Sequence, residues 1–140
     1  MIEVYLNMNG NAREAADYYA RALGGEVTFL MTGEQMPEAD RRNLPAGMEG
    51  KVMHANVTTF AGQIMLSDNF PGQECLPSPA MNITLSHTDE DKIRAAFEAL
   101  AKDGQVGMPL EPSFFSKLFG VVVDKYGFCW MLMSSEEPEA

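Results

Sequence analysis

Few side chains in this sequence could do acid–base chemistry, and His54 is the strongest candidate. The chain has two histidines. His87 lies beside the start of a predicted helix, whereas His54 lies in "KVMHANVTTF", on the same strand face as Asn56 and Thr58 because side chains alternate along a strand. In this place a histidine could act as a catalytic acid or base, or donate a hydrogen bond to a ligand. A half-buried, hydrogen-bonded structural histidine is the alternative that stays open.

The other reactive side chains give weaker signals. Cys75 and Cys129 form no CxxC motif, and Cys129 has no visible base that would activate it as a nucleophile. Lys117 follows "PSFF" and could bind an anionic or polarised group at the rim of a cavity. It could equally be a surface lysine with a solvated head.

Composition limits the classes of partner. The chain of 140 residues has a net charge of −10 and no cluster of lysine and arginine, so we expect no nucleic-acid partner. No apolar run is long enough to cross a bilayer, so no membrane partner is expected. The beginning "MIEVYLNMNG" does not resemble a secretory signal, and we expect a cytoplasmic protein with reduced thiols.

The elements that position these residues begin with a predicted helix in 11–25. Asn11 is a candidate N-cap, and Glu14 could complete a capping box. The glycines Gly24 and Gly25 end the pattern. Its apolar stripe consists of Ala12, Ala15, Ala16, Tyr19, Ala22 and Leu23.

A second helix is predicted in 88–104 by the same signals. Thr88 is the candidate cap, with Asp91 three residues on, and Gly104 ends the helix. Its stripe consists of Ile93, Ala96, Phe97 and Leu100.

Each helix follows one short strand pattern and precedes three more, which indicates an internal duplication. Both halves end in similar phrases, "AGQIMLSD" at 61–68 and "YGFCWMLMS" at 126–134. The predicted fold is α+β, with two tandem βαβββ modules in a single domain. Two unrelated amphipathic helices with strands around them would be the chance alternative.

Module one is expected at about 1–69, a proline-containing linker at about 70–80 and module two at about 81–134. The acidic tail 135–140 is expected to be disordered. The segment 33–50 is long for a loop and would be a flap over a site or an interface arm.

Strand alternation predicts one apolar face against the helices and one mixed face. The mixed face would carry tyrosine, methionine and cysteine together with asparagine, threonine and histidine, which favours a pocket lining over a plain solvent-exposed face. The residues predicted to bind a ligand are Tyr5, Asn7, His54, Asn56, Met65, Asn82, Thr84, Lys117 and Met131.

Three stretches resemble a known family: "YLNMNGNAREAADYYARALGGEV", "HANVTTFAGQIMLSDNFPG" and "FGVVVDKYGFCWMLM". They are similar to the PhnB-like subfamily, often described as 3-demethylubiquinone-9 3-methyltransferase-like. This subfamily belongs to the glyoxalase/bleomycin resistance/extradiol dioxygenase group, the vicinal oxygen chelate superfamily. The resemblance implies a half-barrel with a central cavity and a homodimer, in some relatives with modules exchanged between chains. No glycine-rich loop that would hold S-adenosylmethionine follows a strand, so methyl transfer is not expected.

The resemblance also tells where metal-dependent members hold their ion, on the first and last strand of each module. The matching positions here are Tyr5, Met65, Asn82 and Met131, with Val4 in place of Tyr5 in a glyoxalase-type register. Thioethers are soft, neutral and weak ligands, and a neutral tyrosine or an amide does not supply the missing charge. We therefore expect neither the metal site nor any other cofactor.

These observations predict a protein that binds a small hydrophobic or aromatic organic molecule in its cavity, because flexible methionines form an adaptable apolar wall. The first alternative is an enzyme, independent of metal or with an atypical metal, that uses His54 as acid or base. A second alternative is a structural or regulatory dimer with a vestigial cavity.

Overall fold

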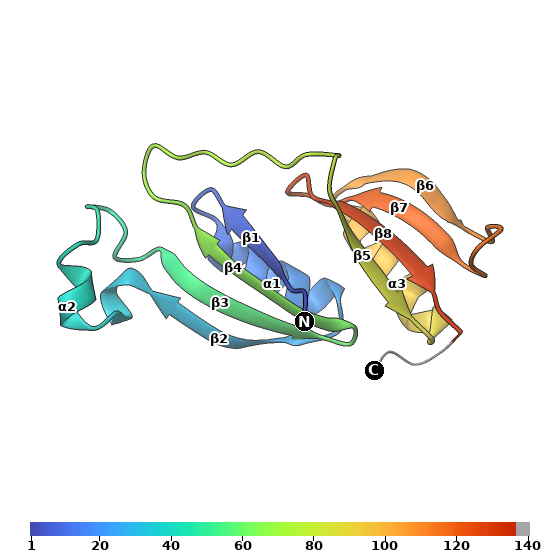
Figure 1. Ribbon diagram of the computed structural model, residues 1–140, viewed down its shortest axis with the longest axis horizontal. Helices are drawn as coiled ribbons and strands as arrows, with labels where there is room; N and C mark the ends of the chain where they lie inside the picture. The colour runs from blue at the N-terminus through green and yellow to red at the C-terminus, as the bar shows by residue number, and fades with distance from the viewer. Residues whose placement is uncertain (137–140) are drawn as a thin grey trace. The chain divides into compact units, whose positions relative to one another are not determined.

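The computed structural model describes residues 1–136 and divides into two compact units, Met1–Cys75 and Leu76–Ala140 (Figure 1). From residue 137 on, the tail that was expected to be disordered lies outside the described residues. No helix in the described part of the chain is long and apolar enough to span a membrane.

Unit 1 is a four-stranded mixed sheet with one long helix on one face (Figure 1). The strand order is β1-β4-β3-β2, and β1 runs parallel to β4 while the other neighbours are antiparallel. The helix packs against all four strands. Along the chain the elements are β1 (Val4–Met8), α1 (Ala12–Ala22), β2 (Glu26–Thr32), β3 (Val52–Thr59) and β4 (Gly62–Asp68).

Unit 2 repeats this topology. Its sheet has the order β5-β8-β7-β6, again with only the first pair parallel, and the helix α3 packs on one face. Its elements are β5 (Asn82–His87), α3 (Glu90–Lys102), β6 (Gln105–Glu111), β7 (Phe119–Val123) and β8 (Cys129–Ser134). The prediction of two βαβββ modules is confirmed, whereas the half-barrel, the central cavity and the single-domain boundaries stay predictions.

The segment between β2 and β3 is not wholly irregular. It contains a short 3-10 helix, η1 (Gly33–Gln35), and one turn of helix, α2 (Glu38–Arg41). The Gln35 side chain accepts a hydrogen bond from the Thr32 backbone N–H at 2.9 Å, which fixes the start of η1.

Both helices bury the predicted stripes. In α1 the alanine stripe lets the helix lie close to the sheet, and Tyr19 is fully buried; only Ala22 of that stripe is half-buried. In α3 all four predicted residues are buried.

The glycine after each helix shows why the duplication keeps this residue. A Cβ on Gly25 would lie 1.7 Å from the Thr58 carbonyl oxygen, and one on Gly104 would lie 2.0 Å from that of Val123. The helix ends thus contact the β3 and β7 backbones in the same way, at a distance that only glycine permits.

The two helix starts differ from the predicted caps. Asn11 is the N-cap residue of α1 but makes no capping hydrogen bond through its side chain. Instead Asp68, at the end of β4, accepts from the Ala12 N–H at 2.9 Å and from the Val52 N–H at 2.9 Å. A carboxylate is a stronger acceptor than an amide oxygen and also favours the helix dipole.

In α3 the N-cap is Asp89 and not Thr88. The Asp89 carboxylate accepts from the N–H groups of Asp91 and Lys92 at 3.0 and 3.3 Å. The prediction was wrong by one residue because threonine and aspartate are both good caps and stand next to each other.

The predicted strand faces are confirmed with one correction, at Met53. Alternation with Ala55 and Val57 predicts Met53 on the helix-facing side, but an irregularity in the β2–β3 register at this point buries Val52 instead and leaves Met53 half-buried.

Candidate functional site

The face of the first sheet that α1 leaves uncovered carries a row of four registered side chains. Tyr5 on β1 is opposite Met65 on β4, Met65 is opposite Asn56 on β3, and Asn56 is opposite Phe29 on β2. His54 lies two residues from Asn56 on the same face and is opposite Met31. The sheet therefore brings four of the predicted residues together: Tyr5, His54, Asn56 and Met65.

A chain of hydrogen bonds joins three of these side chains. The Tyr5 hydroxyl lies 3.2 Å from His54 Nδ1, and His54 Nε2 lies 2.8 Å from Asn56 Oδ1. Both ring nitrogens are thus engaged, and the imidazole is held by Tyr5 from β1 and by Asn56 from its own strand β3. His54 has a defined orientation and is only half-buried, which a ligand-binding or acid–base residue requires.

Aromatic rings flank the imidazole on both sides. The Tyr5 ring centroid lies 5.7 Å from that of His54, and the Phe29 centroid lies 5.9 Å from it. Tyr5 is 42% exposed and Phe29 is 43% exposed, which is high for side chains of this size in a sheet. Such a surface offers an apolar and aromatic contact with a few polar groups at its centre, as ligand sites do.

Sequence reasoning missed Phe29. A register shift between Val27 and Phe29 breaks the alternation of β2, so the faces of this strand cannot be derived from the sequence pattern. A phenylalanine next to a threonine on a predicted strand was the signal that the sequence offered.

The uncovered face of the second sheet has a corresponding row. Thr84 on β5 is opposite Met131 on β8, Met131 is opposite Val121 on β7, and Val121 is opposite Met108 on β6. This row is more apolar than the first, and Met108 is 53% exposed.

The register corrects one correspondence between the modules. Asn82 was matched with Tyr5, but Asn82 is opposite Cys129. Thr84 is the residue opposite Met131, as Tyr5 is opposite Met65. The expected match lies two residues too early along β5.

Two other predicted residues lie outside these rows. Asn7 is exposed, lies two residues from Tyr5 on the same face of β1 and is opposite Ser67. Lys117 lies before β7, where its ammonium is 4.0 Å from the Glu136 carboxylate and its side chain is 71% exposed. Lys117 thus has the setting of a surface lysine.

The superfamily implies a metal site, and the side chains at those positions do not fit one. The paired residues are Tyr5 with Met65 and Thr84 with Met131. All four are neutral side chains, and the two thioethers are weak ligands for Zn²⁺, Mn²⁺ or Fe²⁺. Within residues 1–136 no group of three or more His, Cys, Asp or Glu side chains could hold an ion.

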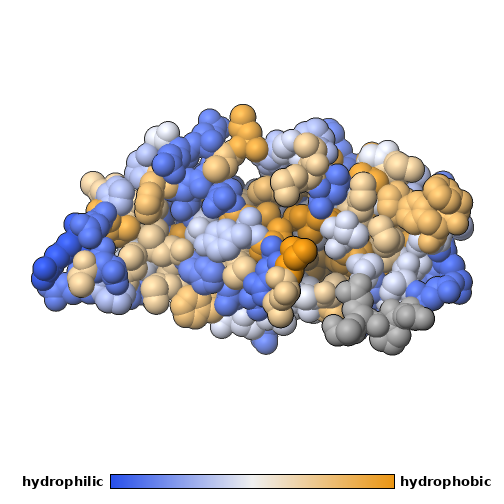
Figure 2. Space-filling model, in the orientation of Figure 1, coloured by the Kyte–Doolittle hydropathy of each residue, from blue (hydrophilic) through white to orange (hydrophobic). Residues whose placement is uncertain are grey.

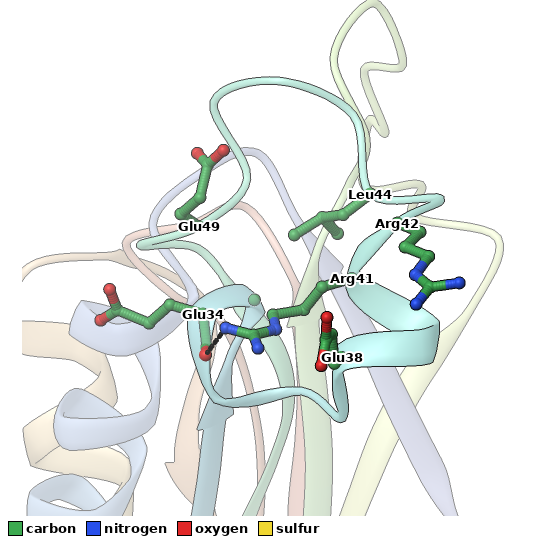
Figure 3. A pocket seen from close by; sticks show the side chains of 7 residues that line it. Glu34, Glu38, Arg41, Arg42, Leu44 and Glu49 are labelled. Atoms are coloured by element: carbon green, nitrogen blue, oxygen red, sulfur yellow. Dashed lines mark hydrogen bonds between the residues drawn. The ribbon is translucent and has the colours of Figure 1, made fainter.

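A separate surface pocket of about 350 Å³ lies beside η1 and α2 (Figure 3). Figure 2 shows hydrophilic residues where Figure 1 has α2. Arg41 donates to the Glu34 carbonyl oxygen at 3.3 Å. The Arg42 side chain points away from Glu34 (Figure 3). None of the predicted ligand-binding residues is among its lining, which consists of Gly33, Glu34, Glu38, Arg41, Arg42, Leu44 and Glu49.

The doubled module defines the class of protein. A glyoxylase/bleomycin resistance protein/dioxygenase domain from Frankia sp. EAN1pec superposes with a TM-score of 0.64 over 96% of both chains, at 14% identity. The fold is therefore that of the glyoxalase/bleomycin resistance/dioxygenase superfamily.

The family follows from closer similarity. The sequence model of the family described as 3-demethylubiquinone-9 3-methyltransferase matches residues 1–133, and the chain belongs to this PhnB-like family. It is 31% identical to Protein YjdN of Escherichia coli over 91% of this chain and 90% of that protein. The structure of PA1353 from Pseudomonas aeruginosa is similar with a TM-score of 0.82 and 33% identity, covering 98% of both chains. The structure of the PhnB protein from Bacillus cereus is similar with a TM-score of 0.75 and 32% identity, covering 96% of this chain and 98% of that one.

Proposed function

We propose that this protein binds a small apolar or aromatic organic molecule on the uncovered face of its first sheet, without a metal ion. The observation that carries the proposal is the hydrogen-bonded set Tyr5–His54–Asn56 between the exposed rings of Tyr5 and Phe29. The ring faces and the Met65 thioether supply apolar contact, and the three polar groups supply orientation.

The alternative that this face is only wetted by solvent is less consistent with its composition. Solvent-facing sheet surfaces usually carry charged side chains, whereas the row from Tyr5 to Phe29 has none. A ligand that covers all of the 43% of Phe29 that is exposed would gain about 1 kcal/mol of binding free energy.

A fragment screen by NMR tests this proposal. We expect aromatic fragments to shift the amide signals of β1, β3 and β4 around Tyr5, His54 and Met65. Phe29→Ala should weaken the best fragment by up to about fivefold. Phe70→Ala removes a phenylalanine of similar exposure, 48%, outside the sheet and serves as the matched control. Equal weakening by both variants would contradict the proposal.

A second candidate function is acid–base catalysis through His54, and the Tyr5 contact favours it. The Tyr5 oxygen could take a proton from a bound molecule while the Tyr5 hydroxyl proton moves to His54 Nδ1. Tyr5 then ends neutral, His54 carries the additional proton, and the bound molecule has lost one. For a fragment that binds, NMR in D₂O would detect catalysed exchange of its C–H protons. Exchange that His54→Ala abolishes and Thr58→Ala leaves intact would establish the enzyme, and exchange that both variants leave intact would exclude His54.

We also propose that the chain forms a homodimer. This is supported by β6, which is the outer strand of the second sheet within residues 1–136 and exposes Val106 and Met108 beside its open edge. Light scattering at micromolar concentration should give twice the chain mass of 15.4 kDa. A monomeric mass would contradict this.

A further inference from the structure

We infer that the molecule bound on this face carries an O–H or N–H donor, which it gives to the Tyr5 hydroxyl oxygen. Resting on the proposed function, the inference names the chemical class of its ligand as a phenol or an aryl N–H compound. The inference rests on the direction of the hydrogen bonds in the set Tyr5–His54–Asn56, that is, on which group donates in each contact.

The Asn56 end of the chain sets this polarity. An amide oxygen only accepts hydrogen bonds, so the 2.8 Å contact between Asn56 Oδ1 and His54 Nε2 requires the proton on Nε2. A neutral imidazole has one proton, so Nδ1 is then bare and accepts. The Tyr5 hydroxyl, 3.2 Å away, must therefore donate its proton to Nδ1.

This use of the Tyr5 proton determines what the surface offers to a ligand. A phenolic hydroxyl has a single proton and oxygen lone pairs that accept. With the proton directed at His54, the exposed Tyr5 oxygen is available only as an acceptor. The complementary donor at the other end of the chain is the Asn56 amide nitrogen, which a ligand's acceptor group could meet.

The neighbouring side chains limit the ligand to a flat, apolar body. Met65 lies between Tyr5 and Asn56 in the register of the sheet, and thioethers make favourable contacts with aromatic rings. Phe29 closes the same row on the β2 side. An aromatic ring lying on Met65 would place a ring hydroxyl or N–H next to the Tyr5 oxygen.

A pair of probes that differ in one methyl group tests the donor. p-Cresol has the O–H, and 4-methylanisole has the same ring with the oxygen methylated. At about pH 8, where an ordinary imidazole is neutral, we expect p-cresol to bind about 3- to 10-fold more tightly by NMR titration, the value of one hydrogen bond. In Tyr5→Phe the ratio should fall to about 1, with 4-methylanisole affinity changed less than about twofold.

A second measurement reads the proton on His54 directly. Long-range ¹H–¹⁵N spectra of the imidazoles should show the Nε2–H tautomer. His87 provides an internal reference, since its Nδ1 accepts from the Asp89 N–H at 3.0 Å and it should be the same tautomer. In Asn56→Ala we expect a mixture of tautomers at His54 and a reduced preference for p-cresol.

The outcomes separate this inference from the proposed function. If both probes bind on this face with equal affinity, or His54 is the Nδ1–H tautomer, the donor inference is overturned and the proposed function stands. If both probes shift only signals elsewhere, or none, the proposed function is overturned together with the inference. A preference for p-cresol that Tyr5→Phe removes supports both.

Discussion

Asp68 makes a strong prediction about stability, because one buried carboxylate joins the first helix to the third strand. It is 7% exposed, and its two oxygens accept from the N–H groups of Ala12 and Val52, both at 2.9 Å. These two backbone donors belong to residues that are 0% and 1% exposed, so bulk water does not reach them in the folded protein.

The magnitude follows from the two N–H groups that the change would leave unpaired. Each buried unsatisfied N–H costs about 1–3 kcal/mol, and the lost interaction with the helix N-terminus adds about 0.3–1 kcal/mol. We expect Asp68→Ala to lower the free energy of unfolding by about 4 kcal/mol. Asp68→Asn keeps one acceptor oxygen and should cost about half as much.

The assay is urea unfolding followed by circular dichroism, with amide hydrogen exchange as the local readout. Exchange of the Ala12 and Val52 amides should accelerate most in Asp68→Ala. Asp17→Ala removes an exposed carboxylate from α1 and is the control, with an expected change below about 0.5 kcal/mol. An equal change in both variants, with Ala12 and Val52 still protected, would refute the reasoning.

Three further predictions concern packing, the second unit and metals. Gly25→Ala should lower the free energy of unfolding in urea by at least about 2 kcal/mol, because its Cβ would meet the Thr58 carbonyl. At Gly50 an added Cβ would meet nothing within 4 Å, so Gly50→Ala should be nearly neutral, and similar values for both variants would contradict the close approach at Gly25. The buried indole N–H of Trp130, the only tryptophan, donates to the Asp124 carboxylate at 2.9 Å. Asp124→Ala should therefore lower the free energy of unfolding and red-shift the tryptophan fluorescence, and unchanged emission would count against this. Calorimetric titration with Zn²⁺ or Mn²⁺ should show no saturable binding, and one tightly bound equivalent would show that the neutral donors have been misjudged.

Most of the fold could be predicted from the sequence, because local patterns determine it. Alternation indicates strands such as β1, β3 and β4, and the two long helices come from stripes such as Ile93, Ala96 and Phe97. Short elements such as α2 were missed, since one helical turn leaves no periodic pattern.

The candidate site was predictable only as a set of residues sharing a face. Alternation placed His54 and Asn56 together, but the hydrogen bond from Tyr5 to His54 depends on strand order and register across 49 residues of chain. The bulge before Phe29 and the true partner of Met131 depend on the same register. A sequence pattern carries no information about which strands pair, so these contacts needed the structure.

Methionine methyl NMR tests the central claim most directly, that a small aromatic molecule binds on the uncovered face of the first sheet. Some of the eleven methionines lie on the uncovered face of the first sheet, and others lie in the segment 33–50 that holds the charged pocket. With ¹³C-methyl methionine and saturating p-cresol, we predict shifts at Met65 and Met31 and none at Met36 and Met48, which lie in the segment around the charged pocket. Shifts confined to Met36 and Met48, with Met65 unchanged, would contradict the account.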